Sequence, residues 1–207
     1  MGGTPGVGSG SAAPPPVPHV QNPNPKGGAA AAVPMPKPTP QLAQAVVAEA
    51  RKNVGSADWS AKTARAPYGA GTNKCNLFVF ETLNKAGTPV PLQGRIKWKG
   101  LTDEHLPPLA GDWANPKANI KGWDVVKNPQ PGDVAAQKEF YLDASGHVGI
   151  VVAPGKTVSA SSITDRIEEN DWGFRKEQQD QVVFRRYVGD AWHPIEPKFP
   201  TSGRNAL

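Results

Sequence analysis

The order of two hydrophobic periods along the chain constrains its fold most strongly. Apolar residues recur at helical spacing in residues 39–55 and again in residues 75–87. After the turn signal "PQPGD" at residues 129–133, the pattern changes to short β-branched runs that Gly or Pro turns separate. Helical segments followed by strand segments are typical of an α+β domain. We therefore expect N-terminal helices packed on an antiparallel sheet.

The expected elements have local signals at their ends. Thr39 is a candidate N-cap for the first helix, Pro40 fits its first turn, and Gly55 can end it. Gly87 ends the second helix in the same way. Residues 88–128 are broken by Pro, Trp and Gly, and we expect at most short helices there, such as one near "LTDEHL". Strands are expected at residues 133–138, 147–152, 156–161, 166–171 and 181–188.

The first 40 residues differ in composition from the rest, with 11 Pro, 7 Gly and no acidic or aromatic residue. Such a segment cannot bury enough apolar surface to offset the entropy lost on ordering. We expect residues 1–39 to be a disordered Pro/Gly-rich arm, residues 40–195 to form the folded domain, and residues 196–207 to be a C-terminal tail. The N-terminus also lacks the basic start and the apolar run of a signal peptide.

Composition argues against several classes of protein. The net charge is only +5, without a run of Lys and Arg interleaved with aromatic residues, so nucleic-acid binding is not expected. No stretch approaches the roughly 18 apolar residues of a membrane span. A single cysteine excludes an internal disulfide and a multi-cysteine zinc site, and the four histidines lack metal-ligand spacing. We therefore expect no metal and no other cofactor.

Cys75 is the only cysteine, and it stands where a polar loop gives way to an apolar helical stripe. A catalytic cysteine reacts as the thiolate, and the free N–H groups and dipole of a helix N-terminus favour that anion. The neighbouring Lys74 would favour it too. The alternative interpretation is a buried structural cysteine that opens a helix.

His147 precedes the uniformly apolar run 148–152 and directly follows a Ser-Gly turn. Such a run is typical of a central strand, and a histidine at its end can present a base to a nucleophile on a packed helix. The alternative interpretation is a hydrogen-bonded structural histidine at a strand end.

Together, "APYGAGTNKCNLFV", "PQPGDVAAQ" and "SGHVGIVVAPGKTVSASS" resemble the NlpC-type cell-wall cysteine peptidases and the related CHAP amidases. The resemblance covers residues 40–190 and implies a papain-like fold, with Cys75 as nucleophile and His147 as general base. Tyr68 would correspond to the tyrosine that lines the oxyanion hole of the family, where the backbone N–H of Cys75 would be a second donor. Asp133 matches the aspartate of the family's Pro-Gly-Asp turn, and we expect it to be a turn residue.

The sequence departs from the family pattern on both sides of the cysteine. Lys74 and Asn76 stand where the family has Asp and Ser. Asn76 could hydrogen-bond the substrate, or it could be a solvated residue of the first helical turn. These departures bear on the choice of substrate more than on the chemistry.

A third polar residue should orient the imidazole of His147, and the family places it on the next strand. Ser159 stands there, 12 residues after His147. A three-residue hairpin loop at 153–155 would turn Ser159 and Ser161 to the face of His147, whereas a loop of two or four residues would not. If the strand after that of Ser159 runs beside the strand of His147, Asn170 and Asp171 are the rival candidates for the orienting residue.

The sequence therefore predicts a cysteine-dependent amidase or endopeptidase that cleaves amide bonds in peptidoglycan stem peptides. Because no signal peptide is visible, we expect synthesis in the cytoplasm and delivery to the periplasm or cell wall of a target cell, as an antibacterial effector or lysin. A type VI secretion effector fits, and it would imply an immunity protein and a carrier in the secretion apparatus. Two alternatives stay open: a papain-like deamidase or acyltransferase acting on proteins or lipids, and a non-catalytic binding or adaptor module.

Overall fold

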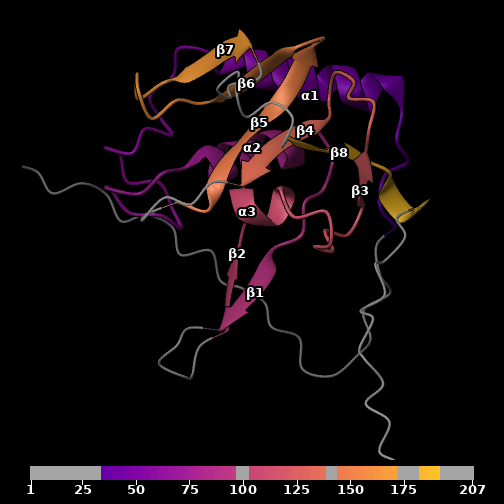
Figure 1. Ribbon diagram of the computed structural model, residues 1–207, viewed down its shortest axis with the longest axis horizontal. Helices are drawn as coiled ribbons and strands as arrows, with labels where there is room; N and C mark the ends of the chain where they lie inside the picture. The colour runs from indigo at the N-terminus through magenta and orange to yellow at the C-terminus, as the bar shows by residue number, and fades with distance from the viewer. Residues whose placement is uncertain (1–33, 97–102, 139–143, 172–181, 192–207) are drawn as a thin grey trace, which may run out of the picture. The chain divides into compact units, whose positions relative to one another are not determined.

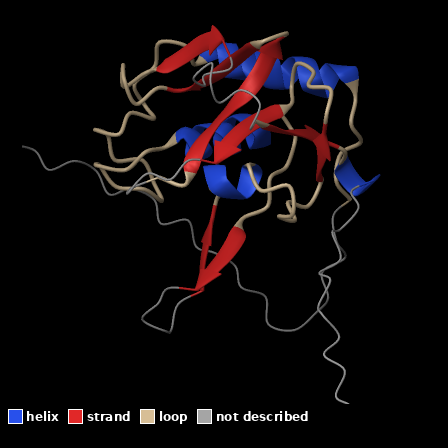
Figure 2. Cartoon of the chain, in the orientation of Figure 1, coloured by secondary structure: helices blue, strands red, loops and turns tan. Residues whose placement is uncertain are grey.

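The computed structural model describes four segments of the chain, residues 34–96, 103–138, 144–171 and 182–191 (Figure 1). Contacts between residues divide the chain into two units, Met1–Val33 and Pro34–Leu207, and every described residue lies in the second. Figure 2 shows that this second unit combines helices with β-strands.

The two main helices form where the sequence predicts them. α1 spans Pro40–Lys52, and the Thr39 side chain accepts a hydrogen bond from the backbone N–H of Leu42 at 3.1 Å. α2 spans Cys75–Lys85, and Gly87 follows it at φ 87°, a conformation that costs glycine little. Two shorter elements are α3 (Ala110–Trp113) and the 3-10 helix η2 (Gly189–Ala191).

Six strands form one antiparallel sheet in the order β3-β8-β4-β5-β6-β7. The five strands that the sequence predicts are all present, as β4 to β8. The strands are β3 (Trp123–Val126), β4 (Val134–Lys138), β5 (Gly146–Ala153), β6 (Lys156–Ala160), β7 (Ile167–Asp171) and β8 (Val183–Tyr187).

Two features between residues 88 and 128 differ from the expectation. The expected helix near "LTDEHL" is wrong, because β2 (Asp103–Leu106) pairs there with β1 (Gln93–Ile96) in a separate two-stranded sheet. β3 also lies in this segment, and its ladder partner β8 is far along the chain. Formation of β3 depends on pairing with the distant β8, which local composition does not indicate.

The helices pack against the central strands. α1 and α2 contact β5, and α3 contacts both β4 and β5 (Figure 1). Side chains alternate between the two faces of a strand, and the fully buried pair Val134 and Ile150 belongs to the core face. By the same alternation His147 and Gly149 of β5 share the other face, with Ser159 of β6 beside them.

The segment just before α1 is held against β8 and η2. The backbone N–H of Met35 donates to both carboxylate oxygens of Asp190, at 3.1 and 3.2 Å, and the Tyr187 hydroxyl donates to the Pro36 carbonyl at 2.8 Å. We call residues 34–38 the strap. The strap lies within the stretch expected to be a disordered arm, so part of that stretch belongs to the folded unit.

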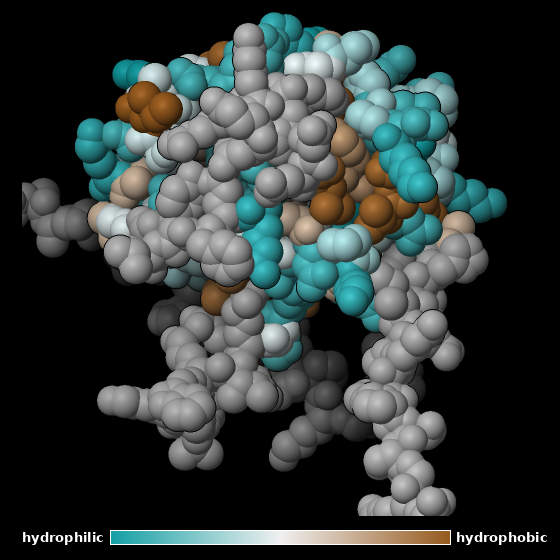
Figure 3. All heavy atoms as spheres, in the orientation of Figure 1, coloured by the Kyte–Doolittle hydropathy of each residue, from teal (hydrophilic) through white to brown (hydrophobic). Residues whose placement is uncertain are grey.

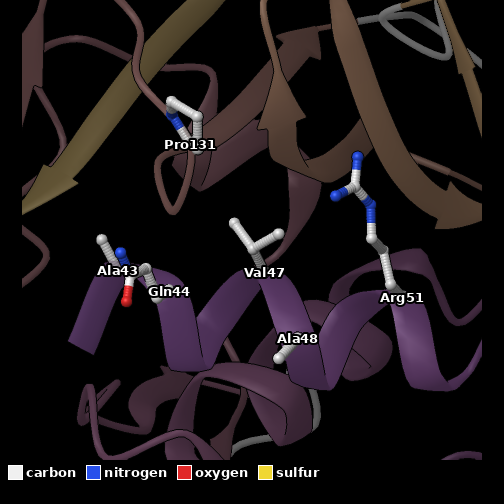
Figure 4. A pocket seen from close by; sticks show the side chains of 6 residues that line it. All are labelled: Ala43, Gln44, Val47, Ala48, Arg51 and Pro131. Atoms are coloured by element: carbon white, nitrogen blue, oxygen red, sulfur yellow. The ribbon is translucent and has the colours of Figure 1, made fainter. Parts of the chain in front are cut away.

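Among the residues coloured in Figure 3, hydrophilic ones predominate, and apolar residues form one larger group and several smaller ones. An apolar hollow lies on α1, between Ala43, Val47 and Arg51 of the helix and Pro131 of the turn before β4 (Figure 4). The residues that line this hollow include none of the candidate site residues. Within the described segments, no helix has the length and apolarity that crossing a membrane requires.

Candidate functional site

Cys75 is the first residue of α2 and lies beside the start of β5. No side chain caps this helix end in the described structure, so the first backbone N–H groups can face the sulfur or a bound anion. The Cys75 sulfur is within hydrogen-bonding reach of the backbone N–H of Val148. Since Val148 directly follows His147, the fold brings the cysteine to the strand end that carries the expected base.

Burial raises the pKa of the Cys75 thiol above its ordinary value. The side chain is only 8% exposed. Backbone N–H groups of Val148, Asn76 and Cys75 itself lower the pKa but do not offset burial. The helix N-terminus alone therefore does not make a thiolate here, contrary to the simplest reading of the sequence. The neutral thiol is the favoured form, and reaction needs a base that removes its proton.

His147 meets Ser159, the residue that the sequence favours as its partner. The distance between His147 Nε2 and Ser159 Oγ is 3.0 Å. This contact uses Nε2, so a proton exchange between the imidazole and a nucleophile would have to use Nδ1. A hydroxyl can donate or accept, and Nε2 keeps its proton only when Ser159 accepts.

The hairpin that brings these two residues together differs from the expected one. Its loop is the two-residue turn 154–155, where three residues were expected. A bulge between Val151 and Ala153 adds the missing residue to β5. The extra residue restores the register, so that Ser159 still shares the face of His147.

Gly149 makes room for the contact between these strands. A Cβ on Gly149 would lie 2.9 Å from the Ser159 Cβ and 3.0 Å from the Val158 carbonyl oxygen. The first distance is shorter than real Cβ atoms show, and the second is tighter than most Cβ contacts. The glycine in "HVGI" therefore lets β6 approach closely enough for Ser159 to reach His147.

Lys74, which departs from the family pattern, is buried in the preceding loop. Its side chain is 1% exposed, and its ammonium donates to the backbone carbonyls of Ser60 and Thr72, at 3.2 and 2.8 Å. Within the described residues it forms no ion pair, and burial lowers its pKa. Lys74 thus closes the loop 60–72 against the start of α2.

Asn76, the second departure, holds Tyr68 of the same loop. It is buried, and its Nδ2 donates to the Tyr68 hydroxyl oxygen at 2.9 Å. The interpretation of Asn76 as a solvated first-turn residue is therefore wrong. Because the Tyr68 oxygen accepts from Asn76, the hydroxyl proton of Tyr68 points away from the Asn76 amide. Both departures fix the loop next to Cys75, which no spacing in the sequence indicates.

The remaining candidates make other contacts or lie on another strand. Asp133 accepts a hydrogen bond from the backbone of its own turn and pairs with an arginine of β8, as expected of a turn residue. Asn170 and Asp171 lie on β7, and β6 separates that strand from β5, so the arrangement that would favour them does not occur. Ser161 accepts hydrogen bonds from the backbone of the turn 163–164. In the described segments no group of acidic, His and Cys side chains could hold a metal ion.

Comparison with known proteins relates the chain to a family. The model of the CHAP domain matches residues 65–164. This match, with helices packed on a six-stranded antiparallel sheet, confirms the α+β papain-like fold of the CHAP and NlpC type. No curated protein matches the chain.

Several solved structures show a low similarity. The Resuscitation Promoting Factor Interacting protein RipA, in a form mutated at one cysteine, has 17% identity and a TM-score of 0.46, over 72% of this chain and 63% of its own. A hypothetical invasion protein of Mycobacterium tuberculosis has 17% identity and a TM-score of 0.44, over 75% of this chain and 70% of its own. The P60 domain of an M. avium subspecies paratuberculosis antigen has 15% identity and a TM-score of 0.42, over 69% of this chain and 93% of its own. The chain thus spans less than two thirds of the RipA chain, and at these scores the similarities carry no conclusion.

Proposed function

We propose that this domain hydrolyses amide bonds in the stem peptides of peptidoglycan, with Cys75 as the nucleophile. The observation that carries the proposal is the contact of His147 with Ser159, at the end of β5 that lies beside Cys75. The backbone N–H of the next residue, Val148, faces the Cys75 sulfur. The match of the CHAP domain to the segment that holds these three residues supports the same chemistry.

The reaction would proceed through a thioester. His147 takes the thiol proton at Nδ1, and the thiolate of Cys75 attacks the carbonyl carbon of the scissile amide. The oxygen of the tetrahedral intermediate is stabilised by the backbone N–H of Cys75 and by the hydroxyl of Tyr68, which Asn76 positions. His147 then protonates the leaving amine, and the acyl group stays on the sulfur. Water, deprotonated by His147, hydrolyses the thioester and regenerates the thiol.

Digestion of purified cell-wall sacculi tests this proposal. We expect the wild-type protein to release new amines and peptide ends, which mass spectrometry of the muropeptides would identify. Cys75→Ala and His147→Ala should abolish release, because the first lacks the nucleophile and the second lacks the base. Circular dichroism should show that both variants fold. A folded wild-type protein that leaves sacculi of several wall chemistries intact would refute the proposal.

We further propose that the chain acts on the wall of a target cell, as an antibacterial effector or lysin. Expression in a bacterial host should be toxic when an added export signal carries the chain to the periplasm, and harmless in the cytoplasm, where no peptidoglycan lies. Cys75→Ala should remove the toxicity. Delivery by a type VI apparatus and neutralisation by an immunity protein remain predictions, which co-purification with such partners would test. Toxicity confined to the cytoplasm would favour a protein or lipid substrate instead.

A further inference from the structure

Gln137 of β4 is a buried polar residue that the proposed chemistry leaves without a role. Its side chain is fully buried, and within the described residues neither its amide oxygen nor its amide nitrogen has a hydrogen-bond partner. Unpaired polar atoms in a protein interior are destabilising, and native folds retain few of them. An amide kept under these conditions suggests a purpose other than stability.

The strand register places this amide beside the expected base. Gln137 pairs directly with His147 in the β4–β5 ladder, so the two side chains project from the same face. Residues paired in this way have their Cβ atoms about 4.5–5.5 Å apart, within reach of a glutamine amide. Ser159 approaches His147 from β6, on the opposite side of β5. The imidazole therefore lies between a hydroxyl from β6 and an amide from β4.

We propose that Gln137 is a positioning residue for His147: its amide flanks the imidazole and keeps the ring oriented with Nε2 toward Ser159 and Nδ1 toward Cys75. Ser159 offers a single hydroxyl, which fixes a ring less firmly than a carboxylate does. A second neighbour restricts rotation of the ring. When His147 receives the thiol proton, the unpaired amide oxygen can turn toward the cation without breaking another hydrogen bond. This inference rests on the proposed role of His147 as the base.

Other polar groups on this face of the sheet do not share this position. Thr157 is fully buried with an unpaired hydroxyl as well, but it pairs with Val151, away from His147. Glu168 is the charged residue that β7 contributes to this face, and it pairs with Ser159 rather than with His147. Thr157 is therefore a matched control, a buried unpaired group without the catalytic neighbour.

The test compares Gln137→Met with Thr157→Val in the full chain. Both substitutions remove an unpaired polar group while nearly conserving volume, so each should raise the melting temperature by about 2–4 °C. On soluble muropeptides Gln137→Met should lower kcat about tenfold or more with little change in KM, because the ring is no longer held in place. Alkylation of Cys75 by iodoacetamide should slow to a similar degree, since it depends on the same proton transfer. Thr157→Val should leave kcat, KM and alkylation unchanged.

The outcomes separate this inference from the proposed function. Slower alkylation of Cys75 in Gln137→Met supports the inference even if the wild-type protein cleaves no muropeptide. Absence of muropeptide cleavage would refute only the proposed substrate. Unchanged kcat and alkylation in a stabilised Gln137→Met would overturn it. A lower melting temperature, with activity lost only in proportion to unfolding, would make Gln137 a packing residue and would also overturn it.

Discussion

At the scale of single residues, Lys74 shows how the chain departs from the pattern of the family that it resembles. A buried ammonium is unfavourable unless it is well hydrogen-bonded, and here its partners are backbone carbonyls of one loop. That loop carries Tyr68, which Asn76 holds from the other side of Cys75. The two unusual neighbours of the cysteine therefore act on the loop, which is where a change of substrate preference would arise.

The burial of Lys74 predicts a particular pH dependence of stability. Its pKa in the folded protein lies below the unfolded value, so between the two the unfolded chain binds more protons and the free energy of unfolding rises with pH. We expect this gain in the alkaline range, up to the ordinary lysine pKa of about 10.4, and we expect Lys74→Met to lack it. Urea unfolding of both proteins across that range measures the difference. The exposed Lys117, changed to Met, should behave like the wild type; an identical slope in Lys74→Met would contradict the prediction.

Tyr68 gives a prediction for the oxyanion. If its hydroxyl stabilises the tetrahedral intermediate, Tyr68→Phe should lower kcat by about 10²-fold with a smaller effect on KM. Asn76→Ala should produce part of the same loss, because the hydroxyl is then less well placed. In the double variant the two losses should not add. Steady-state kinetics on soluble muropeptides decides the matter, and fully additive effects would mean that the two side chains act separately.

At the scale of elements, the β5–β6 hairpin determines which residue meets His147. The sequence indicates both strands, the Gly155 turn and the face of Ser159, because all of these follow from local patterns. It does not indicate the bulge, since a two-residue turn with a bulge and a three-residue turn give the same register. The hairpin thus reaches the predicted contact through a different backbone.

Gly149 allows a prediction about the spacing of these strands. Gly149→Ala places a methyl group against Ser159 and the backbone of β6, so either the strands separate or Ser159 moves. We expect a loss of about 1–3 kcal/mol in the free energy of unfolding. The kcat should fall at least as far as in Ser159→Ala, because the hydrogen bond to His147 is displaced. Chemical denaturation and kinetics of both variants test this, and a fully active Gly149→Ala would show that the close approach is dispensable.

The elements also show where sequence reasoning stops. Helices α1 and α2 and strands β4 to β8 follow from periodicity and turn residues. The choice of Cys75, His147 and Ser159 rests on the resemblance to the NlpC and CHAP families, and their catalytic roles stay predictions. The pairing of Gln137 with His147 does not follow from periodicity, because it depends on the register between β4 and β5. Burial of Lys74 depends on how the preceding loop folds back on it, which local patterns do not indicate. Charged residues usually remain exposed, so composition predicts the opposite.

At the scale of the whole molecule, the strap makes the start of the folded unit longer than α1 alone. Its contacts reach the last described strand and helix, so it joins the two ends of the described chain. Removal of residues 1–38 should lower the free energy of unfolding by about 1–3 kcal/mol, because the Tyr187 hydroxyl and the Asp190 carboxylate lose their partners. Removal of residues 1–33, which spares the strap, is the control. Equal stability of the two truncated chains would show that the strap does not contribute.

The hydroxyl of Ser159 has a consequence for the conditions in which the protein works. A carboxylic acid or a second imidazole in its place would gain a proton in acid solution, and the ring would then lose its acceptor. A serine hydroxyl does not ionise in that range. The partner of His147 therefore keeps its capacity to accept a hydrogen bond in acid solution.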